Sequence, residues 1–354
     1  MKILVPINID RNSVENNPFV DVICAGLQRH GHEVVCSRDL FWKAPYSFDL
    51  IFFQWPDEIV LEEHKIKQDV EIIKSHLQTI KKKGIPMVVT VHNLHPHNNN
   101  QYLTTIYDVI YSSVDAFHHM GCYSYEHMKQ RFPKAYHFIV PHPTYFDDIE
   151  VALSPKECKK KYKLPKRKIV VIAFGAFRNN EERKMLINLC HKYYLKCCFF
   201  APKFNRGIGA NRSKFSKIFS YIFFRLQGIR MYRGPVSDTN VMEMIKGADI
   251  LFIQRKDILN SGNLSLGFSA GKIVVGPDMG NVGMILRDTG NPVFNPFDPY
   301  SIYNAMDKAL IMLKQGNRQG KQNFKYAKDN WTKNHVTDIL NKELTQFYKN
   351  IVLH

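Results

Sequence analysis

The sequence lacks an apolar run of the roughly 18 residues that cross a membrane, and its start lacks the charged and long apolar regions of a secretory signal. Its seven cysteines are an odd number, and none shows paired metal-ligand spacing. We therefore expect no membrane span, no signal peptide, no disulfide framework and no cysteine zinc site. Reduced thiols in the cytoplasm are the expectation.

A dinucleotide-binding fingerprint, GxGxxG, is also missing after the first strand-like run at 2–7. The stretch that follows, residues 7–20, contains no glycine. Glycines in such a turn let the backbone approach a pyrophosphate closely. Their absence argues against an NAD-dependent enzyme.

Acidic residues are scarce in one block of the chain. Between Lys156 and Arg233 there are 21 Lys and Arg but only 3 Asp and Glu, whereas the remainder has 28 basic and 29 acidic residues. The block therefore carries the whole excess of the +17 net charge. Such a block suits phosphate, an anionic membrane or nucleic acid, and a solvated basic face is the alternative.

What the sequence has is a repeated alternation of strand-like and helical runs, in a chain of 354 residues with 45% hydrophobic residues. This pattern predicts two parallel, Rossmann-like α/β sheets, one in residues 1–150 and one in residues 168–325. The basic, proline-punctuated stretch 151–167 reads as a linker. One long helix is expected over residues 59–84, and the chain reads as helical from Pro299 to its end.

The most informative stretch is 260–286, NSGNLSLGFSAGKIVVGPDMGNVGMIL. Ser261, Gly262 and Asn263 precede a short apolar helix that ends at Gly271, and residues 273–277 read as a buried strand. Small polar residues at a helix start leave N–H groups for an anion, which suits a nucleotide diphosphate. The alternative is an ordinary capped helix of an α/β sheet.

Four segments resemble the GT-B glycosyltransferases, the family 4-like group and its bacterial polysaccharide relatives. They are NSGNLSLGFSAGKIVVGPDMGNVG at 260–283, FGAFRNNEERK at 174–184, YRGPVSDTNVMEMIKGADILFI at 232–253 and TVHNLHPH at 90–97. The resemblance implies two Rossmann-like, doubly wound domains that face a cleft. Residues 1–150 would bind the acceptor, residues 168–325 the nucleotide sugar, and helices at 326–354 would cross back to the first domain.

The implied activity is transfer of a sugar from a UDP- or GDP-linked donor to a glycan or lipid-linked acceptor, in capsular or other surface polysaccharide biosynthesis. The resemblance assigns the donor diphosphate to Arg178, Lys184 and the helix start at 261–263, with Arg183 as an alternative to Lys184. Leu266 stands where family 4 has a glutamate, which is a departure from that family. The chain lacks an Asp-x-Asp pair beside a strand end, so we expect a hexosyltransferase that needs no metal and no other cofactor.

Histidines mark the acceptor side. His92 and Asn93 end a strand-like run, His95 follows in the loop, and a strand end suits a general base or a hydroxyl contact. The resemblance adds His119, near a second strand end, beside the donor sugar. A metal site on His92, His95 and His97, or a plain polar loop, is the alternative.

Segment 203–233 mixes cations with aromatic and aliphatic residues, as an amphipathic helix on an anionic membrane does. An insertion packed on the domain, or a nucleic-acid surface, are the alternatives. The favoured interpretation places the protein in the cytoplasm, peripheral at the inner face of the plasma membrane, with no nucleic-acid partner. Rival functions are a nucleotide-sugar epimerase of the same architecture and a non-catalytic basic binding protein.

Overall fold

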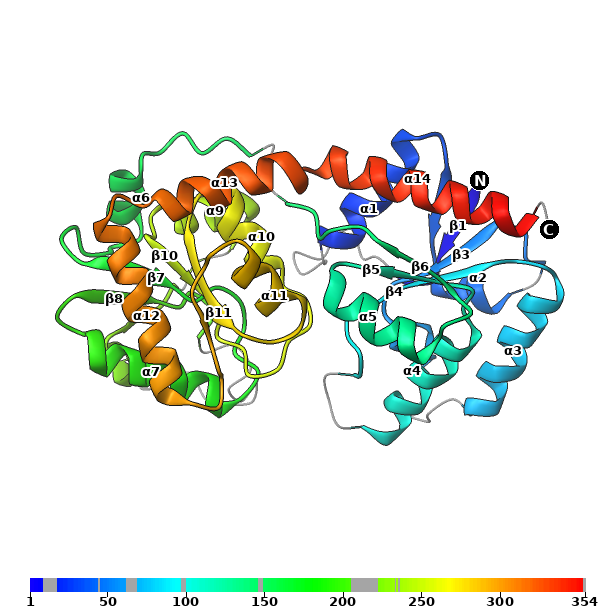
Figure 1. The fold of residues 1–354 in the computed structure, drawn as a ribbon, viewed down its shortest axis with the longest axis horizontal. Coiled ribbons are helices and arrows are strands. Elements are labelled where there is room, and N and C mark those ends of the chain that lie inside the picture. The colour runs from blue at the N-terminus through cyan, green and yellow to red at the C-terminus, as the bar shows by residue number, and fades with distance from the viewer. Residues whose placement is uncertain are drawn as a thin grey trace. The chain divides into compact units, whose positions relative to one another are not determined.

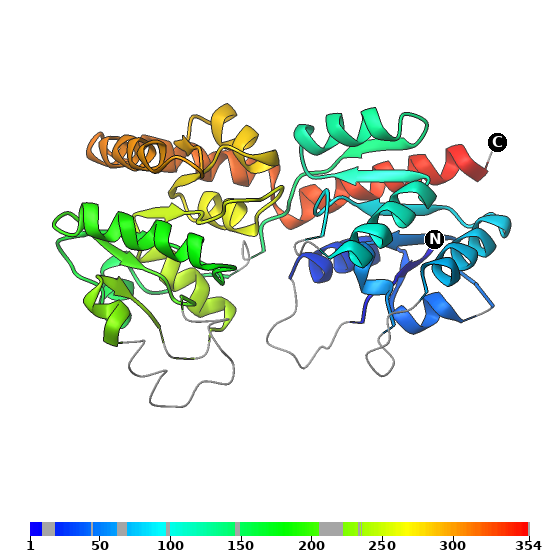
Figure 2. The ribbon, with the colours of Figure 1, turned by 90° about the horizontal axis from the view of Figure 1, so that it is seen from below.

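The computed structural model describes residues 1–8, 18–43, 45–61, 69–96, 100–145, 149–204, 222–232, 234 and 236–352. The chain divides into two compact units. Unit 1 comprises Met1–Tyr145 and Lys333–His354, and unit 2 comprises Phe146–Thr332. Each unit contains a parallel six-stranded sheet with helices on both faces (Figures 1 and 2), which confirms the predicted doubly wound α/β class.

Unit 1 has the strand order β2-β1-β3-β4-β5-β6. Strands β3, β4 and β5 at its centre are buried throughout, as expected where helices cover both faces of a parallel sheet. The strands are β1 (Lys2–Val5), β2 (Glu33–Cys36), β3 (Leu50–Phe53), β4 (Met87–Thr90), β5 (Ala116–His119) and β6 (Tyr136–Ile139). The helices are α1 (Pro18–Arg29), α2 (Arg38–Trp42), α3 (Val70–Lys82), α4 (Gln101–Ser113), α5 (Cys122–Arg131) and α14 (Lys333–Val352), with a 3₁₀ turn at Pro56–Ile59.

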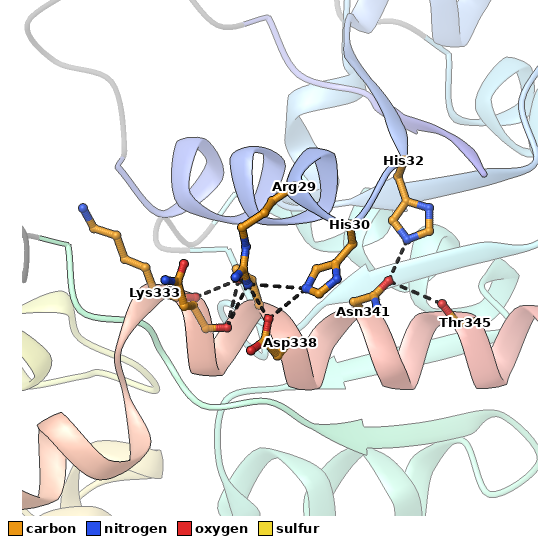
Figure 3. A network of polar contacts seen from close by, with 9 residues as sticks. Arg29, His30, His32, Lys333, Asp338, Asn341 and Thr345 are labelled. Atoms are coloured by element: carbon orange, nitrogen blue, oxygen red, sulfur yellow. Dashed lines mark hydrogen bonds and ion pairs between the residues drawn. The ribbon is translucent and has the colours of Figure 1, made fainter.

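The last helix, α14, packs along α1 within unit 1. Asp338 Oδ1 accepts a hydrogen bond from Arg29 Nη2 and lies 2.9 Å from His30 Nε2, and Asn341 Oδ1 lies 2.7 Å from His32 Nε2 (Figure 3). A Cβ added to Gly26 would lie 2.2 Å from the side chain of Thr337. Glycine is therefore what allows the two helices to approach so closely.

Unit 2 has the strand order β12-β11-β10-β7-β8-β9. Its strands are β7 (Ile169–Ile172), β8 (Cys197–Phe200), β9 (Ile229–Arg230), β10 (Ile250–Phe252), β11 (Ile273–Pro277) and β12 (Val293–Phe294). Its helices are α6 (Pro155–Lys161), α7 (Asn180–Tyr193), α9 (Asp238–Lys246), α10 (Gly262–Ser269), α11 (Gly280–Asp288), α12 (Pro299–Lys314) and α13 (Arg318–Asn330), with a short helix at 222–226.

Alternate residues of the strands in unit 2 pack into two separate hydrophobic cores. Val171 of β7 packs with α7 and α12, whereas Val170 and Ile172 pack with α9, α10 and α11. Val171 lies opposite Ile250 of β10 and Phe199 of β8. The period-2 alternation of a strand thus builds one core on each face of the sheet.

Two sequence expectations are wrong. Residues 59–84 do not form one helix, because the 3₁₀ turn ends at Ile59 and α3 begins after Asp69, whose carboxylate accepts from the Glu71 N–H as an N-cap. The stretch 151–167 is not an irregular linker. Ser154 and Glu157 form a capping box that starts α6, which packs on α9 within unit 2.

Candidate functional site

The strand order of unit 2 creates a topological switch point. From β7 the chain runs outward through β8 and β9, then returns to form β10 on the other side of β7. The loops that leave β7 and β10 therefore diverge at their carboxyl ends. In open α/β sheets this is where ligands bind.

Three segments are tied together at this point through one carbonyl. Phe174 O, just beyond β7, accepts hydrogen bonds from Asn263 Nδ2 at 2.7 Å and from Gln254 Nε2 at 3.3 Å. The next residue, Gly175, has a φ of +96°, which L side chains rarely adopt. The loop after β7, the loop after β10 and the start of α10 thus form one constructed surface.

Two arginines lie on this surface, and one buried carboxylate binds the guanidinium of Arg255 and the backbone of Arg178. Glu182, at the start of α7, accepts from Arg255 Nη1 at 2.7 Å and from the backbone N–H of Arg178 at 2.8 Å. The Glu182 side chain is only 2% exposed and that of Arg255 is 13% exposed. Burial has removed much of the freedom of this ion pair, so Arg255 is held in place.

Arg178 lies at the end of the loop after β7, as its position after a buried strand predicted. Its Nη1 donates to Asp257 O at 3.2 Å, and its side chain is exposed. Partial loss of contact with water and then repulsion from Arg255 lower the pKa of Arg178. Arginine remains protonated in proteins, so both guanidinium groups keep their positive charge and repel each other. An anion placed between them would relieve their repulsion.

Further cations come from neighbouring strands at the same edge. Lys203, beyond β8, places Nζ 5.4 Å from the centre of the Phe174 ring. Lys256 pairs with Glu181 at 3.0 Å and lies over the Phe297 ring at 4.9 Å. With Arg178 and Arg255, the exits of β8, β7 and β10 supply four cations.

Lys184 and Arg183 are placed differently from Arg178. The exposed Lys184 lines a cavity of about 220 Å³ beside Lys256 and Phe297, whose other walls come from α7 and the start of α12. Arg183 is buried, and its guanidinium donates to the carbonyls of Phe177 and Phe204. Arg183 therefore joins the loops after β7 and β8 and is used in packing.

The helix start predicted at 261–263 is present. Ser261 is the N-cap of α10, and its Oγ accepts from the Asn263 N–H at 3.3 Å. Gly271, with a φ of +65°, follows the end of the helix, and β11 is buried throughout, both as predicted. Leu266 is buried in the core on the α10 side of the sheet.

Gly280 explains why the loop before α10 lies so close to α11. Its φ is +55°, and a Cβ there would lie 2.6 Å from Ile258 O. Asn281 Nδ2 donates to Asn260 Oδ1 at 2.8 Å across the same contact. The glycine-rich segment thus supports the loop that carries Ser261.

In unit 1, His92 follows β4 and lies between aromatic rings. It stacks on Trp55 with ring centres 4.1 Å apart, and it meets the edge of Phe19 at 4.8 Å. Its Nε2 lies 3.2 Å from Oε1 of the buried Gln54, which follows β3. His92 is half-buried, and the exits of β3 and β4 fix its orientation.

The neighbours of His92 are less constrained. Asn93 O accepts from Tyr111 Oη at 2.6 Å, whereas His95 is exposed. His97 lies outside the described residues. No cluster of three His, Cys, Asp or Glu side chains that could hold a metal occurs in the described part of the chain.

His119 ends β5 but has no exposed surface. Its Nδ1 lies 3.3 Å from Ser124 Oγ, and its Nε2 lies 3.0 Å from His137 Nδ1. Burial, followed by repulsion from His137, lowers the pKa of His119 to about 2. The ring is therefore neutral at pH 7 and is enclosed by the protein. Its expected place beside a sugar stays a prediction.

The sequence analysis missed Arg255 and Glu182. Arg255 follows the buried run 250–253 just as Arg178 follows its own strand, and this shared position is the signal that could have found it. The partnership with Glu182 spans 73 residues. It depends on β10 lying next to β7, which no local pattern specifies.

Within the described ranges, no helix is long and apolar enough to cross a membrane. No protein-family model matches the chain, and no curated protein matches it.

Solved structures do match over almost the entire chain. Sucrose-phosphate synthase from Thermosynechococcus elongatus has a TM-score of 0.73 at 11% identity, over 99% of this chain and 100% of that one. HepE of Anabaena, in complex with UDP-glucose, has a TM-score of 0.65 at 12% identity, over 98% and 100%. An α,α-trehalose 6-phosphate synthase from Burkholderia multivorans has a TM-score of 0.62 at 11% identity, over 98% of each chain. The chain therefore has the two-domain GT-B fold, as the resemblance in its sequence implied.

Proposed function

We propose that this protein is a glycosyltransferase whose nucleotide-sugar donor binds at the switch point of unit 2. The observation that carries the proposal is the guanidinium pair, Arg178 and Arg255, organised by the buried Glu182. Two cations kept close together at a ligand-binding edge are suited to an anion with two charges, such as a diphosphate.

The chemistry of glycosyl transfer requires such a group. The bond between the anomeric carbon and the diphosphate oxygen breaks, and the acceptor hydroxyl oxygen forms a new bond to that carbon and loses its proton. The electron pair of the broken bond stays on the diphosphate. Arg178 and Arg255 would stabilise this developing charge without reorganising, because Glu182 already holds one of them.

The remaining donor-side residues have supporting roles in this proposal. The start of α10, with Ser261, Gly262 and Asn263, would face the diphosphate with its backbone N–H groups. Lys184 lies at the adjoining cavity and would act on the donor from there. We infer that no metal is required, since the cations of the chain supply the charge that a metal otherwise provides.

The acceptor side is assigned to unit 1. His92 would contact the acceptor hydroxyl or accept its proton, because its ring is fixed by Trp55 and Gln54 at the exits of β3 and β4. Asn93 and His95 would contact the acceptor. The substrate class proposed is a glycan or lipid-linked saccharide of a surface polysaccharide.

UDP-sugars are the first donors to test, because the solved HepE structure contains UDP-glucose. GDP-sugars are the second. Differential scanning calorimetry of the full chain should show a rise in the melting temperature of unit 2 with the correct donor, since a ligand of the native state stabilises it. Incubation with that donor and a saccharide acceptor should yield a glycosylated product, and incubation with donor alone should yield no epimer. No stabilisation by UDP-, GDP-, ADP- or CMP-sugars would contradict the proposal.

A further inference from the structure

The sheet of unit 2 has a second charged edge, at the end opposite the nucleotide site. All its paired strands are parallel, so the segments before β7, β8 and β9 meet at the amino ends of the strands. These segments are Lys166–Lys168, Tyr194–Lys196 and 225–228. We call this surface, together with His191 and Arg230, the basic edge.

Large apolar side chains are exposed on the basic edge. Leu226 is 80% exposed, Leu195 is 72% exposed and Tyr194 is 62% exposed. Single exposed apolar residues are ordinary on a protein surface, but several in one place mark an interaction site. Ile222 and Phe223, one turn before Leu226, are exposed as well.

The short helix at 222–226 is anchored in a way that keeps these groups outside. Phe224 turns inward and meets the buried Phe204 ring, with centres 4.8 Å apart. The turn that follows is closed by Gly228, whose N–H donates to Arg225 O at 3.1 Å. One face of the helix therefore packs on the core, and the other presents Leu226 and Arg225 to solvent.

Cations surround a cavity between the two apolar segments. The cavity has a volume of about 530 Å³ and is lined by Lys168, His191, Arg225 and Arg230, with Tyr194 and Leu226 also in its wall. Lys168 Nζ donates to Tyr194 O, and His191 Nε2 lies 2.5 Å from Gln227 Oε1. Among the described residues that line it there is no Asp or Glu. The cavity is therefore suited to an anionic group.

We propose that the basic edge docks on an anionic phospholipid bilayer. Leu195, Leu226 and Tyr194 enter the headgroup boundary, and Lys168, Arg225 and Arg230 face lipid phosphates. The cavity receives a lipid headgroup. This inference does not depend on the proposed activity, because the basic edge and the nucleotide site lie at opposite ends of the strands.

Charge complementarity and the kind of apolar residue select this partner. The surrounding block carries a net charge of +18 between Lys156 and Arg233, and bilayers with anionic lipids attract such segments. Nucleic-acid surfaces offer aromatic rings for stacking. The two most exposed side chains here are leucines, which insert among lipids and do not stack on bases.

The sequence placed a membrane contact in segment 203–233, and most of that segment, 205–221 and 233, lies outside the described residues. The described structure adds two segments outside 203–233, Lys166–Lys168 and Tyr194–Lys196, which belong to the wider basic block 156–233. The proposed membrane contact is therefore a surface to which several segments of the folded unit 2 contribute.

The charges are tested with full-length protein in vesicle flotation. Vesicles of phosphatidylcholine alone are compared with vesicles that also contain phosphatidylglycerol. The triple variant Lys168→Gln/Arg225→Gln/Arg230→Gln should bind the anionic vesicles on the order of 100-fold more weakly than the parent. The matched control Lys308→Gln/Lys314→Gln/Lys321→Gln removes three exposed cations from α12 and α13 and should bind like the parent.

The apolar groups are tested separately. Leu195→Ser/Leu226→Ser should weaken binding by about tenfold or more, since two large side chains no longer enter the boundary. Its control, Ile311→Ser/Phe324→Ser, changes two exposed apolar residues of α12 and α13. In all four variants the melting temperature and its response to UDP should match those of the parent. Such a match would show that unit 2 remains folded.

Equal loss in the triple variant and its lysine control would overturn the proposal, because net charge alone would then explain binding. Equal binding to neutral and anionic vesicles would also overturn it. So would retention of vesicle binding in both test variants. Strong binding of transfer RNA without binding to anionic vesicles would assign the basic edge to nucleic acid.

Discussion

Acidification is expected to destabilise unit 1 well before unit 2, because unit 1 contains buried histidines. Burial lowers the pKa of His118 and of His142 from 6.5 to about 4, and it lowers the pKa of His119 to about 2. His118 lies 3.0 Å from Thr90 Oγ1 and 3.1 Å from Val140 O, and His142 contacts Tyr145 Oη at 2.9 Å. The only histidine in the sequence of unit 2 is the exposed His191.

The sign follows from proton uptake in the two states. Well above pH 6.5 the three rings are neutral whether unit 1 is folded or unfolded. Between pH 6.5 and pH 4 the unfolded rings take up protons that the buried rings do not, so the free energy of unfolding falls as the pH falls. At pH 5 each ring removes about 2 kcal/mol, or about 6 kcal/mol for the three together. A domain has a total stability of about 5–15 kcal/mol.

Scanning calorimetry between about pH 7.5 and about pH 5 measures this effect. The range lies on both sides of the pKa of an unfolded histidine, about 6.5. Added UDP identifies the unit 2 transition by raising it. The unit 1 transition should fall steeply as the pH falls, and His142→Gln should reduce the slope by about a third, since one of three such rings is removed. A unit 1 transition that does not move over this range, or that moves in step with unit 2, would refute the reasoning.

Three further predictions concern the site. Glu182→Gln should lower the free energy of unfolding of unit 2 by about 1.5–3 kcal/mol, because the charged hydrogen bonds of Glu182 are lost. The control Glu181→Gln changes a side chain that is 69% exposed and should cost less than about 1 kcal/mol. Equal effects of the two variants in thermal melts would contradict this. His92→Ala should lower turnover by about 10²–10⁴-fold with little change in donor affinity, while the exposed His127→Ala should leave turnover intact; full activity of His92→Ala would remove that residue from the chemistry. EDTA should leave activity unchanged, and loss of activity restored by Mn²⁺ would reject a metal-free site.

Local signals in the sequence were enough to predict the elements that carry the proposed donor site. Ser261 before an apolar run predicted the cap of α10, and the β-branched run at 273–277 predicted β11, because both depend on neighbouring residues. Arg178 could be placed at a strand end for the same reason. The residue that orients Arg255 could not be predicted in this way. Glu182 is distant in sequence, and only the strand order brings it to Arg255.

The failures have the same physical origin. The helix expected at 59–84 was read from apolar periodicity, but Asp69 caps a separate helix that starts at Val70. The stretch 151–167 was read as a linker from its charge, although Ser154 and Glu157 supply a capping signal and Cys158 is buried against α9. In both cases a helix N-cap set the structure against the periodicity or the charge of the segment.

Isothermal titration calorimetry with UDP and with uridine, on the parent and on Arg178→Ala, tests most directly whether unit 2 holds a nucleoside diphosphate through its guanidinium pair. The account predicts that Arg178→Ala loses about 1.5–3 kcal/mol of UDP binding, because a charge-assisted hydrogen bond to phosphate is removed. Uridine, which has no phosphate, should bind both proteins equally. Unchanged UDP affinity in Arg178→Ala would contradict the account.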